Sequence, residues 1–265
     1  MIYFRLCPPS RALRCLLPLL LIVGLAACAK PPAGLPSDAV FDPYEEQNRS
    51  VHEFNLSLDR AIVRPAGVGY SEYVPDDIED AIGRFAFNLS LPRSIVNSIL
   101  QGNMLAATED SYRFLVNSTI GLGGVFDVAT DLNMPEANDA DFGQTLHVWG
   151  VREGAYVELP LLGPSTERDT VGLVVDIFTN PLTYILDSPE NYYGTIASVS
   201  SGLSNRGRFA DTIDSVLYES ADSYAQAQSI YLQNRRFKLG NGSDGAFADP
   251  YDDPALSPFE VPDDE

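Results

Sequence analysis

The chain has 265 residues and a formal net charge of −20, with 37 acidic and 17 basic side chains. Such an acidic protein repels both nucleic-acid phosphates and anionic lipid headgroups. We therefore exclude a nucleic-acid-binding protein, and we exclude a polybasic patch as the means of holding the chain on a membrane.

The first 27 residues are typical of a lipoprotein signal peptide. Arg5, Arg11 and Arg14 form a basic region. The apolar run 16–27 follows, which is too short for a bilayer because a spanning helix needs about 20 apolar residues. The run ends in Leu-Ala-Ala before Cys28, the order expected at a site of lipid attachment and cleavage. No Asp follows Cys28, so the sequence predicts an outer-membrane lipoprotein anchored through that residue.

Composition divides the remaining chain into three parts. Residues 28–40 are rich in Pro and Ala and are interpreted as a lipidated tether, and residues 41–243 form a single folded domain. Residues 244–265 carry eight acidic and no basic side chains, so they are predicted to be disordered. Cys7 and Cys15 lie in the leader, which leaves the mature protein without a disulfide.

Helical signals dominate the first half of the folded domain. Asp42 is expected to cap a first helix, which Pro65 ends. A similar pattern at Pro75 predicts a second helix, and Pro92 is expected to begin a third. Gly102 ends that third helix, and a fourth follows directly from Asn103.

The second half of the domain is less regular. Residues 156–159 are the only convincing extended run. The apolar segment 170–186 is interrupted by polar residues, and it predicts a buried or interfacial helix that breaks near Asn180. Helical periodicity returns over 206–238. The predicted fold class is mainly α, a single domain of amphipathic helices with glycine-rich loops and little β structure.

The middle of the folded domain mixes glycines and charged groups with Phe, Leu and Val. Buried charges must be paired, so the mixture suits a wall with one oily and one aqueous face. Arg113 and Arg168 are able to bind a phosphodiester through their guanidinium groups. Structural pairing is nevertheless the preferred interpretation for both. Asp169 adjoins Arg168 in the sequence, and Asp110 and Asp127 are the nearby partners for Arg113.

The sequence does not indicate an enzyme. The chain has two histidines, His52 and His147, and neither lies in a G-x-S-x-G or H-E-x-x-H motif. Spacing alone does not test a Ser-His-Asp site, because its members meet only in space. Asp139 and Asp141 are interpreted as a solvated acidic loop, and the GLGG run at 121–124 lacks the register of a nucleotide-binding loop. We expect no catalysis, no cofactor and no metal ion.

Several sequence blocks together resemble the MlaA family, also called VacJ, of outer-membrane lipoproteins that handle phospholipid. The blocks are DPYEEQNRSVHEFNLSLDRAIVRP, VNSILQGN, RFLVNSTIGLGGVFDVAT, DFGQTL with WGV, and GAYVELPLLGPS with RD. They occur in order and at the family's spacing over roughly residues 41–240. The chain departs from the family at Gln228, where an Arg is usual.

The resemblance implies a ring-like disc of amphipathic helices in the inner leaflet of the outer membrane, with an amphipathic pore. It also implies retrograde removal of phospholipid from the outer leaflet, with a trimeric porin and a periplasmic lipid carrier as partners. The alternative is a structural lipoprotein that scaffolds a porin or the cell wall, which would not need the glycine-rich region 113–169. The candidate lipid-path or gating residues are Phe54, Asn55, Arg113, Asn117, Gly121, Gly123, Gly124, Asp127, Asp141, Gln144, Arg168 and Asp169.

Overall fold

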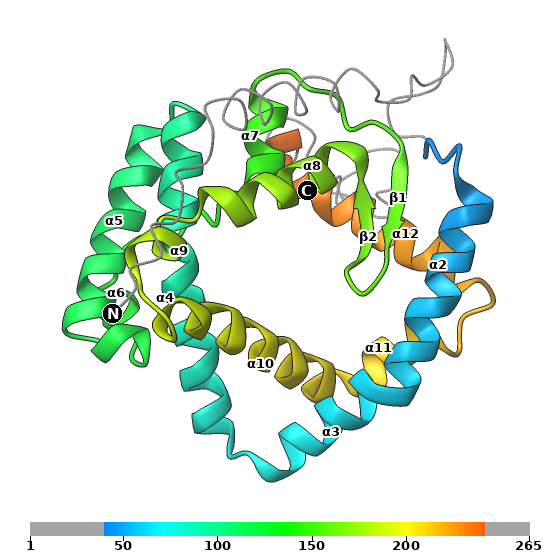
Figure 1. The fold of residues 1–265 in the computed structure, drawn as a ribbon, viewed down its shortest axis with the longest axis horizontal. Helices are drawn as coiled ribbons and strands as arrows, with labels where there is room; N and C mark the ends of the chain where they lie inside the picture. Colours follow the sequence, from blue (N-terminus) through cyan, green and yellow to red (C-terminus); the bar gives the residue numbers. More distant parts are fainter. Residues whose placement is uncertain (1–39, 242–265) are drawn as a thin grey trace, which may run out of the picture.

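Helices arranged as a ring make up most of the structure. The computed structural model describes residues 40–241, and Figure 1 shows the helices following one another around a central gap. A short β-hairpin lies within the ring and directs its turn toward the middle (Figure 1). This arrangement confirms the predicted fold class. The predicted signal peptide with Cys28, the tether as far as residue 39, and the tail 244–265 lie outside the described residues.

The described chain forms helices and helical turns on both sides of the hairpin. In order, they are α2 (Glu45–Leu58), the π-helical turn η1 (Asp59–Val63), α3 (Arg64–Tyr73), α4 (Asp76–Leu100), α5 (Met104–Thr119), the 3-10 turn η2 (Leu122–Gly124), α6 (Val128–Asp131), α7 (Phe142–Val148), β1 (Tyr156–Leu159), β2 (Gly163–Thr166), α8 (Glu167–Thr179), α9 (Leu182–Ile185), η3 (Glu190–Tyr192), α10 (Tyr193–Arg208), α11 (Ala210–Leu217), α12 (Ser223–Arg236) and η4 (Phe237–Asn241).

The first helix begins differently from the prediction. Tyr44 rather than Asp42 precedes α2, and it makes no side-chain cap. Asp42 instead accepts hydrogen bonds from Asn48 Nδ2 at 2.8 Å, from Gln228 Nε2 at 2.9 Å and from the Tyr224 hydroxyl. The carboxylate therefore joins α2 to α12, because residues distant in sequence offer it more donors than a local helix start does.

Two prolines do not interrupt the helices where the sequence predicted breaks. Pro65 lies in the first turn of α3, directly after η1, where the wider winding relieves the clash of its ring with the preceding turn. Pro92 is buried inside α4, which continues to Leu100. Contacts of α4 with α5 and α10 hold it together across the missing backbone hydrogen bond. The predicted starts at Pro75 and Asn103 are confirmed.

The C-terminal region is divided where the sequence predicted one periodic stretch. Residues 206–238 include the end of α10, the whole of α11 and all of α12. No element was predicted for most of α10, which packs along α3. Gly207 permits that contact, since a Cβ there would lie 2.2 Å from the Gly67 carbonyl oxygen. The predicted break near Asn180 is confirmed, because α8 ends at the preceding residue.

The β-hairpin contains one strand that the sequence predicted and one that it did not. β1 occupies the predicted residues 156–159 and pairs antiparallel with β2. The register sets Tyr156 opposite Thr166 and Leu159 opposite Gly163. β2 reads Gly-Pro-Ser-Thr, which lacks the alternating apolar pattern of a strand, so its conformation depends on pairing with β1.

Many polar and charged side chains of the described residues are buried, and many large apolar side chains are exposed, which is unusual for a water-soluble protein. Among the described residues, Asp110, Arg168 and Glu158 are 0%, 2% and 3% exposed. Large apolar side chains are exposed on α5, α8 and α10, including Leu105, Leu115, Ile177, Phe178, Ile196 and Val199. Within residues 40–241, no helix is both long enough and apolar enough to cross a bilayer. Exposed apolar surface of this extent indicates a partner or membrane surface.

Candidate functional site

The hairpin turn separates two cavities. The turn, residues 160–162, joins β1 to β2, and its Leu161 and Leu162 are 69% and 62% exposed. Leu162 and Pro164 line both cavities, so the cavities flank the hairpin. The protein therefore has one cavity on each side of an apolar turn.

One cavity has a volume of about 250 Å³ and lies among α2, η1, α11 and the hairpin; we name it the apolar cavity. Its aliphatic side chains are Leu56, Leu58, Val63, Leu161, Leu162, Ile213 and Leu217. Arg206 also borders it, but this guanidinium is committed to two carboxylates. It contacts Asp59 at 2.9 and 2.7 Å and Asp214 at 2.6 Å. The apolar cavity thus suits an apolar ligand group.

The second cavity has a volume of about 260 Å³ and lies among α4, α8, α12 and the hairpin; we name it the charged cavity. Arg235 joins two of its acidic side chains, with contacts of 2.6 and 2.8 Å to Asp141 and of 3.0 and 2.9 Å to Asp169. Burial by itself would raise the pKa of Asp169, but the hydrogen bonds from Arg235 and the charge of Arg168 hold that pKa below its usual range. Arg235, Arg168, Asp141 and Asp169 thus form an ionic cluster.

Two further charged side chains, Arg93 and Asp176, line the charged cavity outside that cluster. Asp176 accepts hydrogen bonds from Asn97 Nδ2 at 2.9 Å and from the Phe142 amide at 3.1 Å. Burial raises the pKa of Asp176. Arg93 approaches the carboxylate of Asp139 at 3.6 Å, which is beyond hydrogen-bonding distance. Sequence reasoning missed Arg93 and Asp176, because they are isolated in sequence and belong to different helices.

One face of α2 holds the free edge of the hairpin. Asn48 Oδ1 accepts a hydrogen bond from the Glu158 amide at 2.9 Å. Asn55 Oδ1 accepts from the Leu161 amide at 2.8 Å, while its Nδ2 donates to the Leu159 carbonyl at 3.0 Å. These two side chains, about two turns apart on α2, thus bond the edge of β1 in the way a third strand would. The candidate Asn55 therefore positions the turn between the two cavities.

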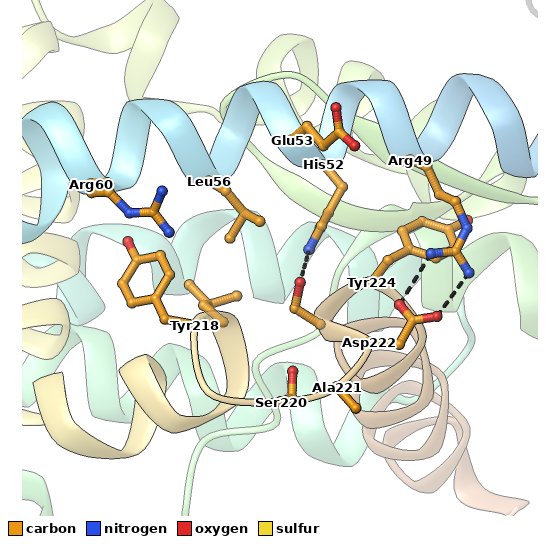
Figure 2. Close-up of a pocket in the computed structure, with 12 residues that line it drawn as sticks. Arg49, His52, Glu53, Leu56, Arg60, Tyr218, Ser220, Ala221, Asp222 and Tyr224 are labelled. Atoms are coloured by element: carbon orange, nitrogen blue, oxygen red, sulfur yellow. Dashed lines mark hydrogen bonds and ion pairs between the residues drawn. The ribbon is translucent and has the colours of Figure 1, made fainter.

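A third cavity, of about 460 Å³, lies between α2 and the connection from α11 to α12 (Figure 2). Here His52 Nε2 contacts Ser223 Oγ at 3.1 Å, and His52 Nδ1 contacts Glu158 Oε1 at 3.3 Å. Glu158 also accepts a hydrogen bond of 2.6 Å from the Tyr156 hydroxyl. With an acceptor at Nδ1, the proton belongs on that nitrogen, and Nε2 accepts from Ser223. Ser223, His52 and Glu158 thus form a hydrogen-bonded chain, which we name the Ser-His-Glu line. Its members are far apart in the sequence, so their spacing did not reveal it.

The surroundings of Ser223 do not favour acyl transfer. Asp222 accepts a hydrogen bond from the Ala225 amide at 3.1 Å, which occupies a donor at the start of α12. Arg49 holds the same carboxylate at 3.1 and 2.9 Å (Figure 2), and these hydrogen bonds lower the pKa of Asp222 to about 2. An oxyanion formed at Ser223 would lie near the negative charge of Asp222, whereas acyl transfer needs hydrogen-bond donors that stabilise the oxyanion. The Ser-His-Glu line is thus suited to joining α2, β1 and α12.

Arg113 belongs to a structural cluster between α5 and α6. Its Nη2 contacts Asp127 at 3.1 Å, and its Nη1 donates to the Pro135 carbonyl at 2.8 Å. Asn117 Nδ2 also donates to Asp127, at 2.9 Å. Asp110, the other proposed partner, bonds to other groups. The cluster fixes the chain that follows η2, and it lines neither the apolar nor the charged cavity.

The glycine candidates form a close contact between η2 and α4. Gly124 has φ of +100°, and a Cβ on it would lie 2.3 Å from Asn88 Cβ. Asn88 Nδ2 donates to the Gly123 carbonyl at 3.0 Å. A Cβ on Gly121 would lie 2.2 Å from the Phe126 carbonyl oxygen. The GLGG run therefore needs glycine for packing, and it lines neither of the two cavities beside the hairpin.

The remaining sequence candidates lie at or near the charged cavity, with one exception. Asp141 and Asp169 line it, and buried Arg168 contacts Asp169 at 3.2 Å. Gln144 contributes its backbone amide, which donates to Asp141 at 2.8 Å and starts α7. Phe54 is the exception, since it is 52% exposed on α2 and lines neither cavity.

The described chain matches a known family almost throughout its length. Residues 40–238 match the family model described as MlaA lipoprotein. The chain belongs to this family. It is 33% identical to the Escherichia coli K12 protein named intermembrane phospholipid transport system lipoprotein MlaA, over 83% of this chain and 86% of that protein. The Haemophilus influenzae protein of the same name is 30% identical, over 84% and 89%.

A solved structure extends the similarity of this MlaA-family chain to its fold. The TM-score is 0.64 at 32% sequence identity, and the alignment covers 75% of this chain and 98% of the solved chain. The report of that structure concerns the structural basis for maintenance of bacterial outer membrane lipid asymmetry. An uncharacterized Rickettsia prowazekii protein is also 36% identical, over 74% of this chain and 77% of its own length.

Proposed function

We propose that this MlaA-family protein is an outer-membrane lipoprotein that removes phospholipids from the outer leaflet and passes them to a periplasmic carrier, in the retrograde direction. The observation that carries the proposal is the pair of cavities beside the hairpin, one aliphatic and one charged. A phospholipid needs both environments, because its headgroup is charged and its acyl chains are apolar. The names of the Escherichia coli and Haemophilus influenzae relatives support this function.

The cavities provide a path that avoids the main cost of moving a phospholipid. A charged headgroup that enters hydrocarbon loses its water without gaining other hydrogen bonds. In the charged cavity, side chains such as Arg93 and Asp176 replace part of that water. The acyl chains keep apolar contact with Leu161 and Leu162 at the hairpin turn. Such a passage preserves lipid asymmetry without energy input from this chain.

The exposed apolar side chains of α5, α8 and α10 seat the ring in the membrane. Apolar surface removed from water contributes about 25 cal/mol per Å². A lipid on Cys28 holds the chain on the inner-leaflet side, facing the periplasm, and two or more acyl chains anchor a protein stably. Cys28→Ser should leave an unprocessed precursor outside the outer membrane, as membrane fractionation would detect. Recovery of that variant in the outer membrane at mature size would contradict the anchor.

The proposed partners are a trimeric porin, beside the apolar outer surface, and a soluble periplasmic lipid carrier. A structural lipoprotein that only scaffolds a porin or the cell wall would also use exposed apolar side chains. It would not need cavities of opposite character beside one hairpin. Cavity variants therefore distinguish transport from scaffolding.

The lipid moves without chemical change in this proposal. The Ala225 amide, near Ser223, already donates to Asp222 and is not available to an oxyanion, which supports a structural role for the Ser-His-Glu line. The other histidine, His147, contacts Arg168 at 3.4 Å, and burial together with that positive charge lowers the pKa of His147. The appearance of lyso-lipid or free fatty acid from labelled phospholipid, dependent on the protein and lost in Ser223→Ala, would establish an enzyme instead.

The transport proposal is tested by filling the apolar cavity. Ile213 lines that cavity and is half-buried, so Ile213→Trp should block the acyl chains and leave the fold intact. In a strain that lacks its own family member, this variant should reach the membrane but leave phospholipid in the outer leaflet. The matched control is Ile230→Trp, at an exposed position outside the cavity. Normal clearance by Ile213→Trp would favour the scaffold.

A further inference from the structure

Arg93 differs from the other arginines that line the cavities beside the hairpin. Arg206 and Arg235 each contact two carboxylates at 3.0 Å or less. Arg93 has one ion pair among the described residues, at 3.6 Å to Asp139. Its Nε is buried without a hydrogen-bond partner, as is Nη1 of Arg206, so the two arginines differ in their ion pairs. Its side chain is 31% exposed, and it lines the charged cavity. Arg93 therefore retains donors for an anionic group.

Asp176 provides the opposite charge in the same cavity. Its oxygens accept from an amide side chain and a backbone amide, and neither donor is cationic. Arg93 and Asp176 line one cavity without an ion pair between them. The other charged side chains of that cavity, Asp141, Asp169 and Arg235, bond to one another. A ligand in the cavity thus meets one available cation and one carboxylate that forms no ion pair within the described residues.

We propose that the charged cavity is a headgroup site selective for zwitterionic phospholipids that carry a primary amine, with Arg93 binding the phosphate and Asp176 binding the ammonium. The inference rests on the proposed transport function and names its preferred substrate class. Guanidinium binds phosphate in a bidentate way, and a primary ammonium donates hydrogen bonds to a carboxylate. At about 260 Å³ the cavity is smaller than typical small-molecule sites of roughly 300–1,000 Å³, so it holds a headgroup rather than a whole lipid.

The selectivity follows from the charges that line the cavity. Its charged side chains are three Asp and two Arg, which gives a formal charge of −1. An anionic glycerol headgroup adds a phosphate but no ammonium, so Asp176 repels it. A quaternary choline headgroup keeps the positive charge but has no N–H to donate to Asp176. The expected order of retention is ethanolamine, then choline, then glycerol headgroups.

The site is tested with the purified, acylated full-length protein and vesicles that contain equal amounts of phosphatidylethanolamine and phosphatidylglycerol. Lipid retained by the protein is quantified by mass spectrometry after the vesicles are removed. The wild type should be enriched in ethanolamine lipid. Arg93→Gln should retain about tenfold less lipid of both kinds, because one charged phosphate contact is lost. Asp176→Asn should retain similar total lipid with the ethanolamine preference reduced to about one.

Two matched variants separate a binding role from a structural one. Arg84 is also on α4 but donates to the Val125 carbonyl outside the cavity, so Arg84→Gln should leave retention and preference unchanged. Arg93→Lys keeps the charge and should restore part of the retention. Circular dichroism confirms that each variant is folded. If an Asp176→Asn sample is unfolded, the ratio of choline to ethanolamine lipid that the wild type retains from vesicles with equal amounts of both tests the same contact.

Competition with soluble compounds identifies which group is recognised. Glycerophosphoethanolamine should displace retained lipid more effectively than inorganic phosphate. Equal displacement by phosphate would mean that the cavity binds phosphate without regard to the amine, which overturns the proposal. Lipid retained and transferred without headgroup preference would also overturn it, while the transport function would stand. A wild type that neither retains nor transfers lipid would overturn the transport function, and the headgroup site with it.

Discussion

The two cavities share a hairpin but differ in how their charges are arranged. In the apolar cavity, Arg206 is bound to two carboxylates, and the remaining wall is mainly aliphatic. In the charged cavity, Arg235 is bound in the same way, yet Arg93 and Asp176 stand outside its ionic cluster. Charge near a cavity therefore does not itself indicate a ligand site. What matters is whether the charge is already paired within the protein.

This distinction predicts that paired arginines support folding and that Arg93 supports binding. Arg235→Gln should give the largest effect, a loss of about 3–5 kcal/mol in the free energy of unfolding, because buried Asp169 and half-buried Asp141 lose the cation that they share. Arg93→Gln should cost less than about 1 kcal/mol, since its ion pair is long and partly exposed. Urea unfolding followed by circular dichroism measures both. Equal losses for the two variants would remove the distinction.

A change outside both cavities tests whether folding and passage are separable. Gly124→Val should destabilise the protein by about 2–4 kcal/mol, because the side chain meets Asn88 and the backbone has positive φ. Gly102→Val is the matched control, since Gly102 also has positive φ but open space around it, and it should cost about half as much. Lipid clearance per folded molecule, measured in membranes with equal amounts of protein, should stay normal in both. A selective loss of clearance in Gly124→Val would give the GLGG turn a role in gating.

A change at the hairpin turn tests the role of the apolar cavity. Leu161 lines the apolar cavity, is 69% exposed and has φ of +69°, a conformation that Asn tolerates better than Leu. Leu161→Asn should therefore leave the thermal midpoint unchanged or slightly higher while several-fold less lipid is transferred. The ethanolamine preference should not change, because the charged cavity is intact. A lowered preference would show that the two cavities do not act separately.

Acidification should abolish headgroup selectivity before it unfolds the protein. The pKa of Asp176 is raised by burial, so this carboxyl protonates above the ordinary value of 3.8 and then no longer attracts an ammonium. The pKa of Asp169 is lowered, so its stabilising ion pair with Arg235 is fully present above the unfolded value of 3.8 and is lost only as pH falls through the lower folded value. Retained lipid and circular dichroism measured along one pH series should show two separate transitions. Coincident transitions would contradict the assignment.

The smallest effect is expected at the Ser-His-Glu line. Ser223→Ala removes one hydrogen bond to His52 and should cost about 0.5–1.5 kcal/mol. Because the line joins structural elements, lipid clearance in cells should be unchanged by Ser223→Ala or by His52→Gln. The outer-leaflet phospholipid content, measured in cells with equal amounts of wild-type and variant protein, checks this expectation. A folded His52→Gln variant that fails to clear lipid would require a functional role for this histidine.

Local signals in the sequence determined much of the helical framework. The helix starts at Pro75 and Asn103, the strand at residues 156–159 and the break at Asn180 all depend on neighbouring residues. Caps, strand propensity and turn residues act over a few positions, so they are readable without tertiary contacts. The ordered family blocks likewise specified the ring-like architecture through resemblance.

Tertiary packing decided the elements and sites that local signals misrepresent. Asp42 left its predicted cap because Tyr224 and Gln228 offer donors from α12, and Pro92 stayed within a helix held by its neighbours. The pairing of Arg235 with Asp141 and Asp169, and the lack of such pairing at Arg93, depend on which helices face one cavity. Charge pairing is set by distances in space, and residues far apart in sequence acquire those distances only when the ring closes.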